Sequence, residues 1–143
     1  MDEQVKIWQR VRGEAPPVTE GLAGLAAGCA ARAALYGALA RQTQGPGRGI
    51  LQQLQETEQR CVRYMKGICR IAEGTAINPG AAPLSPEKME PALRKCYGQT
   101  LKTLSACNAR AFHGEYGPVF TDIAAKMREN CCRLAELMGI LGV

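Results

Sequence analysis

The chain has 143 residues, of which 46% are hydrophobic and 22% charged, and its formal net charge is +5. This composition supplies enough apolar material for one continuous core and excludes a disordered chain. Only 5% of the residues are aromatic, and basic residues form no run. Nucleic-acid binding relies on a clustered basic stripe and stacking aromatics, so we expect no nucleic-acid partner.

Neither the first residues nor the most apolar stretch signals export or a membrane anchor. Residues 1–4 have no basic region followed by an apolar one, as a signal peptide would. The most apolar stretch, residues 21–40, contains Arg32, whose insertion into a bilayer would cost about 2.5–3.5 kcal/mol. We therefore expect a closely packed helix, no membrane partner and a cytoplasmic protein. The seven cysteines form no Cys-x-x-Cys pair, which favours reduced thiols acting as small buried hydrophobes.

Turn residues divide the chain into an extension and two helical halves. Residues 1–17 predict a short N-terminal helix. Residues 19–74 predict two long helices separated by a Gly-Pro turn, and residues 75–84, rich in proline, form a long connection. Residues 85–143 predict two further long helices. Short turns within each half and a long link between the halves predict a single domain, an all-α, antiparallel four-helix bundle made of two hairpins.

The two halves also behave as a repeat with an offset of 69 residues. The offset places Leu51, Leu54, Met65 and Ile68 on Phe120, Ile123, Leu134 and Leu137. It also aligns Glu58 with Met127 and Cys61 with Asn130, so facing helices carry Glu-x-x-Cys and Met-x-x-Asn. Because Glu58 lies within an apolar stripe, its carboxylate must be paired, protonated or bound to a metal.

Several segments together carry a resemblance to a known family. They are Leu22-Ala23-Gly24-Leu25, the stretch Ala34–Arg41, Gly45-Pro46, Ala72-Glu73-Gly74 and Tyr116–Phe120. As a set, they resemble the rubrerythrin-like branch of the ferritin-like superfamily, in particular its small bundles of two halves. The resemblance covers nearly the whole chain and implies a ferritin-like bundle. In that family, a glutamate on each of the first and third helices and a Glu-x-x-His on each of the others hold two metal ions.

Only one of these six ligand positions holds the residue that the resemblance implies. Glu58 occupies the glutamate position of the second helix, whereas the histidine position after it holds Cys61, and the first-helix glutamate position holds Cys29. The other three positions hold Thr100, Met127 and Asn130. We therefore expect a scaffold that has lost the di-iron site, with no catalytic residue, no cofactor and no ferroxidase or peroxidase activity. A structural or protein-interaction role follows, as a homodimer or with an unknown protein partner.

Two other functions stay open. Cys29, Glu58 and Cys61 could form a new metal site, for a soft ion such as zinc or for iron, because thiolates favour softer ions. Alternatively, the chain could be a thiol redox protein, which would need a cysteine of lowered pKa near a positive charge such as that of Arg32 or Arg60.

Three weaker motifs are best interpreted without a function. The pair Glu129-x-x-Cys132 could replace the fourth-helix pair, but it lies off the apolar stripe. Residues 45–49, rich in glycine, precede a helix but follow no strand, so a helix–helix turn is favoured over a phosphate loop. The lone histidine, His113, lies in a predicted turn and is expected at the surface.

Overall fold

The computed structural model describes residues 19–79, 88–112 and 114–142. Within these ranges it contains four helices and no strand, so the all-α class is confirmed. The helices are α2 (Leu22–Arg41), α3 (Pro46–Glu73), α4 (Met89–Arg110) and α5 (Gly117–Leu141). The predicted N-terminal helix over residues 1–17 and the predicted turn residue His113 lie outside the described residues.

Glycine and proline set the ends of the helices. Gly45, at a φ of +74°, precedes α3, and Pro46 begins it, where its missing N–H costs no helical hydrogen bond. Gly74 ends the same helix at a φ of +68°, and its N–H donates to the carbonyl of Arg70 at 2.9 Å. In α5, Pro118 again lies in the first turn. These ends agree with the predicted turns between the long helices.

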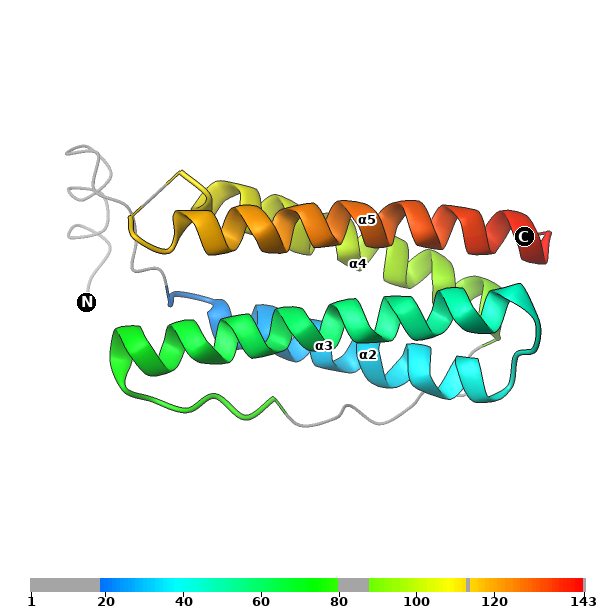
Figure 1. Ribbon diagram of the computed structural model, residues 1–143, viewed down its shortest axis with the longest axis horizontal. Coiled ribbons are helices and arrows are strands. Elements are labelled where there is room, and N and C mark those ends of the chain that lie inside the picture. The colour runs from blue at the N-terminus through cyan, green and yellow to red at the C-terminus, as the bar shows by residue number, and fades with distance from the viewer. Residues whose placement is uncertain (1–18, 80–87, 113, 143) are drawn as a thin grey trace.

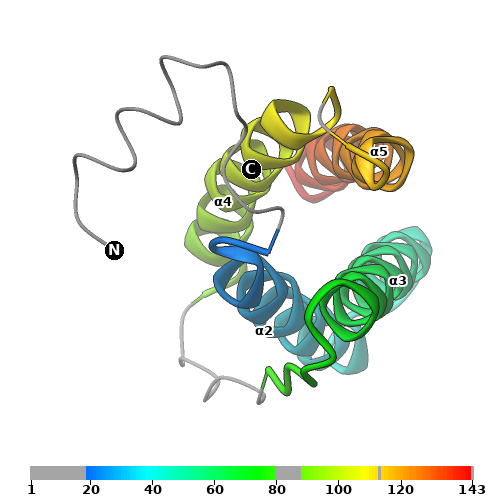
Figure 2. The same cartoon turned by 90° about the vertical axis from the view of Figure 1, so that its left-hand side faces the viewer.

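The four helices pack around one shared interior (Figures 1 and 2). Helix α2 packs against α3 and α4, and α5 packs against the same two helices. Viewed end-on, each helix therefore occupies one corner of a square, with α2 diagonal to α5 (Figure 2). A side chain from one helix that reaches the diagonal helix must cross the centre of the bundle.

The core consists of two apolar clusters separated by polar side chains. One cluster is formed by Leu22, Ala26, Cys29, Cys61, Met65, Ile68, Cys69, Cys107, Phe120, Ile123, Ala124 and Met127. The other is formed by Tyr36, Leu39, Ala40, Ile50, Leu51, Leu54, Leu93, Cys96, Leu134 and Leu137. The buried polar side chains are Arg32, Glu58, Thr100, Thr103 and Asn130. All eight apolar residues matched by the 69-residue offset are buried, as the repeat predicts.

Helix α2 is the most apolar of the four described helices. Among the described residues, it is the one helix that is long and apolar enough to cross a membrane by length and composition, with a mean hydropathy of 1.4. Core helices of water-soluble proteins pass the same test. Arg32, near the middle of α2, is only 3% exposed and lies inside the bundle.

Candidate functional site

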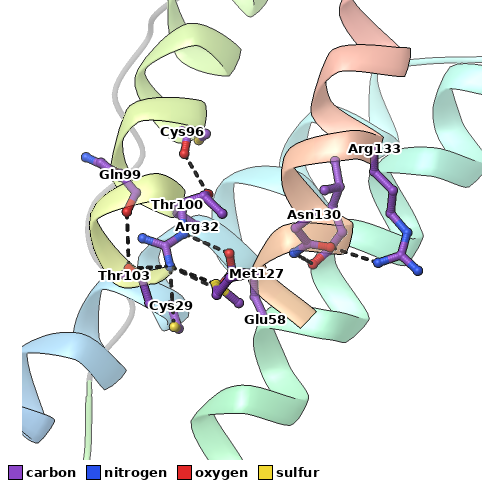
Figure 3. A network of polar contacts seen from close by, with 11 residues as sticks. Cys29, Arg32, Glu58, Cys96, Gln99, Thr100, Thr103, Met127, Asn130 and Arg133 are labelled. Atoms are coloured by element: carbon purple, nitrogen blue, oxygen red, sulfur yellow. Dashed lines mark hydrogen bonds and ion pairs between the residues drawn. The ribbon is translucent and has the colours of Figure 1, made fainter. Parts of the chain in front are cut away.

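The centre of the bundle contains a buried ion pair between α2 and α3 (Figure 3). Nε of Arg32 donates to Oε1 of Glu58 at 2.8 Å, and Nη2 donates to Oε2 at 3.2 Å. Both carboxylate oxygens are therefore bonded by one guanidinium, in the bidentate geometry for which arginine is suited. Glu58 is fully buried. The sequence predicted that this carboxylate would be paired, protonated or bound to a metal. In the structure it is paired with Arg32.

The same guanidinium also reaches the two other helices. Its Nη2 lies 3.1 Å from Oγ1 of Thr103 on α4 and 3.9 Å from Sδ of Met127 on α5, the diagonal helix. The Thr103 hydroxyl donates in turn to the carbonyl of Gln99 at 3.1 Å. On α2 itself, Nη2 lies 3.4 Å from Sγ of Cys29. One cation thus contacts side chains of all four helices (Figure 3).

A second polar contact joins α3 and α5, separate from the Arg32 contacts (Figure 3). Asn130, on α5, donates from Nδ2 to the carbonyl of Leu54 on α3 at 3.4 Å. Arg133 then donates from Nη1 to Oδ1 of Asn130 at 2.9 Å and to Oγ1 of Thr57 at 3.1 Å. Asn130 therefore has protein partners on both sides of its amide, and its oxygen already accepts a hydrogen bond.

The structure brings the predicted site residues to the interior but does not arrange them as a metal site. Cys29, Glu58 and Cys61 are each fully buried, and so are the other three predicted ligand positions. Thr100 donates to the carbonyl of Cys96 at 2.7 Å. No group of three or more His, Cys, Asp or Glu side chains in the described part of the chain could hold a metal ion. The one carboxylate at these positions is bonded to Arg32 through both oxygens. These residues do not fit a two-metal carboxylate cage.

The charge of Arg32 is fixed by its surroundings. Burial by itself would lower the pKa of the guanidinium, but the Glu58 carboxylate beside it outweighs this effect and raises the pKa above its ordinary value. The guanidinium therefore stays charged at neutral pH and well above it. It is a permanent cation at the centre of the core.

The neighbouring thiols are held in the neutral form. Burial raises the pKa of Cys29 well above its ordinary value, and the Glu58 carboxylate raises it further, although Arg32 acts in the opposite direction. Burial, followed by Glu58 and Cys107, raises the pKa of Cys61 to about 12. Both thiols are thus protonated at neutral pH, and a thiol must lose its proton to become a nucleophile or a metal ligand.

Tyr36 is the remaining buried polar group near the centre. Its hydroxyl makes no hydrogen bond to a protein atom within ordinary limits of distance and angle, the single such case among buried side-chain nitrogen and oxygen atoms in the described residues, and the Cys96 thiol lies beside it. Burial raises its pKa, and the nearby Cys96 thiol raises it further. The hydroxyl therefore stays protonated and supplies no charge to the site.

Arg32 is the central residue that the sequence analysis did not assign to the site. The signal was present, because Glu58 in an apolar stripe needed a partner and Arg32 is the one basic residue within the interior of the first predicted helix. It lies three residues after Cys29, close to the face that carries the predicted ligand position. The sequence instead suggested Arg32 as an obstacle to membrane insertion and as a positive charge near a cysteine.

Comparisons with protein-family models, with curated proteins and with solved structures find no match.

Cysteine accessibility gives a direct check of the arrangement of the core. All seven cysteines are free, and six of them are buried, whereas Cys132 is exposed. We expect one thiol to react rapidly with a disulfide reagent such as Ellman's reagent in the native protein, and all seven to react after unfolding in guanidinium. The Cys132→Ser variant should lose the rapid phase. Rapid reaction of several thiols in that variant would contradict the buried positions.

Proposed function

We propose that this chain is a non-catalytic scaffold, a degenerate ferritin-like, antiparallel four-helix bundle that works in the cytoplasm through its surface. The observation that carries the proposal is the guanidinium of Arg32, which contacts all four helices at the level of the predicted ligand positions. A ferritin-like bundle with metal ions needs cationic charge at its centre to balance its carboxylates. Here, one buried carboxylate is balanced by one permanent cation that belongs to the chain itself.

The local electrostatics argue against the use of a metal. A divalent ion among Cys29, Glu58 and Cys61 would lie close to the positive charge of Arg32 and would compete with it for both oxygens of Glu58. It would also have to displace the protons of two thiols whose pKa values are raised by burial. The alternative of a soft-metal site stays a prediction, and it requires that the ion pair be broken.

The alternative of a thiol redox protein has a different obstacle. A redox role would require a positive charge that lowers the pKa of a nearby cysteine. Arg32 does lie near Cys29, but burial and Glu58 outweigh it, and the pKa of Cys29 is raised. A buried neutral thiol is a poor nucleophile, so these contacts favour a packing role for Cys29.

Metal addition tests the proposal. A ligand that binds only the folded state at 100 times its Kd would stabilise it by about 2.7 kcal/mol, which a thermal scan detects easily. We expect the Tm to stay unchanged when zinc or anaerobic iron(II) is added to protein treated with a chelator. We also expect iron(II) to be oxidised in air at the rate seen in buffer alone. A saturable rise in Tm, or faster oxidation that requires Glu58, would overturn the proposal.

A further inference from the structure

The C-terminal half of α3 and the segment after it line an open hollow that no part of the proposed scaffold role explains. The hollow has a volume of about 510 Å³, within the range of small-molecule pockets. Its helical wall is formed by Arg63, Lys66, Gly67 and Arg70, and its other wall by residues 76–78. After Gly74 the chain turns back along this end of the bundle (Figure 1).

The residues that line the hollow carry three positive charges and no negative charge. Arg63, Lys66 and Arg70 lie at positions i, i+3 and i+7, which share one face of a helix, and all three are exposed. None of them forms a salt bridge with any described residue. Glu73, the nearest acidic residue along the helix, accepts a hydrogen bond from Thr19. Like charges at this spacing repel one another. Proximity to the helix C-terminus favours a cation at Arg70 but not at the other two positions.

The opposite wall adds hydrogen-bond donors and is held in place. Ile77 packs against the core cluster that includes Cys61 and Met65, which anchors residues 76–78 beside α3. Within the part of the chain that the structure describes, these residues make no backbone–backbone hydrogen bond. The Asn78 side chain also lines the hollow and supplies an amide donor.

We propose that this hollow, the basic hollow of α3, binds a small anion that carries two or more phosphate groups. The helical rise of 1.5 Å per residue separates the backbones of Arg63 and Arg70 by about 10 Å, so one phosphate group leaves part of the basic row unused. A chain of phosphate groups matches a row of three cations, and guanidinium groups bind phosphate by paired hydrogen bonds. Inorganic polyphosphate and nucleotides share this chemistry.

The test uses the full-length chain and isothermal titration with tripolyphosphate, pyrophosphate, inorganic phosphate and ADP. We expect tripolyphosphate and pyrophosphate to bind more tightly than inorganic phosphate. ADP binding more tightly than pyrophosphate would assign the site to a nucleotide, and the reverse order to an inorganic ligand. Equal binding of inorganic phosphate and tripolyphosphate, or no binding of either, would overturn the proposal, as would binding of a poly-glutamate peptide alone.

Two triple variants distinguish specific binding in the hollow from nonspecific attraction of an anion to a positively charged protein. The variant R63Q/K66Q/R70Q should lose binding by about tenfold for each cation that contacts phosphate. The matched variant R48Q/K102Q/R128Q also removes three exposed positive charges from the net charge of +5, but these lie outside the hollow. It should bind within about twofold of the wild type at physiological salt, where distant charges are screened. Equal losses in both variants would contradict the proposal.

Gly67 permits a test that leaves every charge in place. A Cβ atom at this position would meet nothing within 4 Å, so a larger side chain extends into the open hollow. Because leucine has a higher helix propensity than glycine, the Gly67→Leu variant is expected to fold at least as well as the wild type. It should nevertheless bind tripolyphosphate at least about tenfold more weakly, because each lost charge-assisted contact to phosphate costs about that factor. Full binding in this folded variant would show that the hollow is not the site.

Discussion

Replacing Arg32 with methionine is expected to lower the free energy of unfolding by about 3–5 kcal/mol, the cost of leaving a buried charge without its partner. Glu58 is fully buried, and Arg32 bonds both of its oxygens. Methionine keeps much of the volume but offers no hydrogen-bond donor. The variant Glu58→Gln should also be destabilised, because it leaves the guanidinium without a counter-charge. Urea unfolding followed by circular dichroism measures both effects.

The double variant R32M/E58L makes this prediction specific to the ion pair. Removing both charges leaves no unpaired group, and replacing buried ion pairs with apolar side chains is often neutral or stabilising by about 1–4 kcal/mol. We therefore expect the double variant to be much more stable than R32M and at least near the wild type. The exposed pair of Arg94 and Glu90, 3.1 Å apart, provides the matched control. R94M should cost at most about 1 kcal/mol. A double variant as unstable as R32M would contradict the account.

The protein is also expected to lose several kcal/mol of stability between pH 9 and pH 11. Burial raises the pKa of Cys61 to about 12 and that of Cys107 to about 11, from an ordinary value of 9.0. Above pH 9, the unfolded chain releases these protons while the folded protein retains them, so rising pH favours unfolding. Each such thiol contributes roughly 1–2 kcal/mol per pH unit until the pH reaches its folded-state pKa. Below pH 9, these thiols leave the stability unchanged.

The origin of this alkaline loss can be assigned by removing thiols. The double variant C61A/C107A should show a shallower decline in unfolding free energy from pH 9 to pH 11, whatever its stability at pH 7. The variant C132A removes a thiol from an exposed position and serves as the control. Guanidinium unfolding at fixed pH intervals gives the slope for each protein. An unchanged slope in C61A/C107A would place the alkaline sensitivity elsewhere.

Local patterns in the sequence were sufficient to predict the four long helices and their buried apolar faces. The ends of α3 could be predicted from Gly45, Pro46 and Gly74, because the backbone preferences of glycine and proline act over one or two residues. The 69-residue offset identified buried positions because the helical period repeats in both halves. It also placed Glu58 and Cys61 correctly in the interior.

The partner of Glu58 required information that no local pattern contains. Arg32 and Glu58 are 26 residues apart, and their contact depends on how α2 and α3 are aligned along their lengths. The resemblance directed attention to positions where a metal ligand would lie, and arginine is not a ligand. An arginine on a core face is itself a sign of a buried acidic partner, because such a charge is almost never fully buried alone.

The basic hollow of α3 likewise could not be predicted from the sequence. Arg63, Lys66 and Arg70 have the spacing of an ordinary solvated helix face. Only the path of residues 76–78 turns that face into one wall of a hollow. The packing of Ile77 against the core fixes that path, and a proline-rich connection gives no periodic signal from which it could be predicted.

Elemental analysis of the protein purified without oxygen and without a metal-affinity tag, with free thiols counted on the same sample, tests the central claim most directly. If Arg32 supplies the positive charge at the centre of the bundle, zinc and iron will be far below one per chain, and all seven thiols will react once the protein is unfolded. Near-stoichiometric zinc or iron, with Cys29 and Cys61 protected from alkylation until a chelator is added, would contradict it.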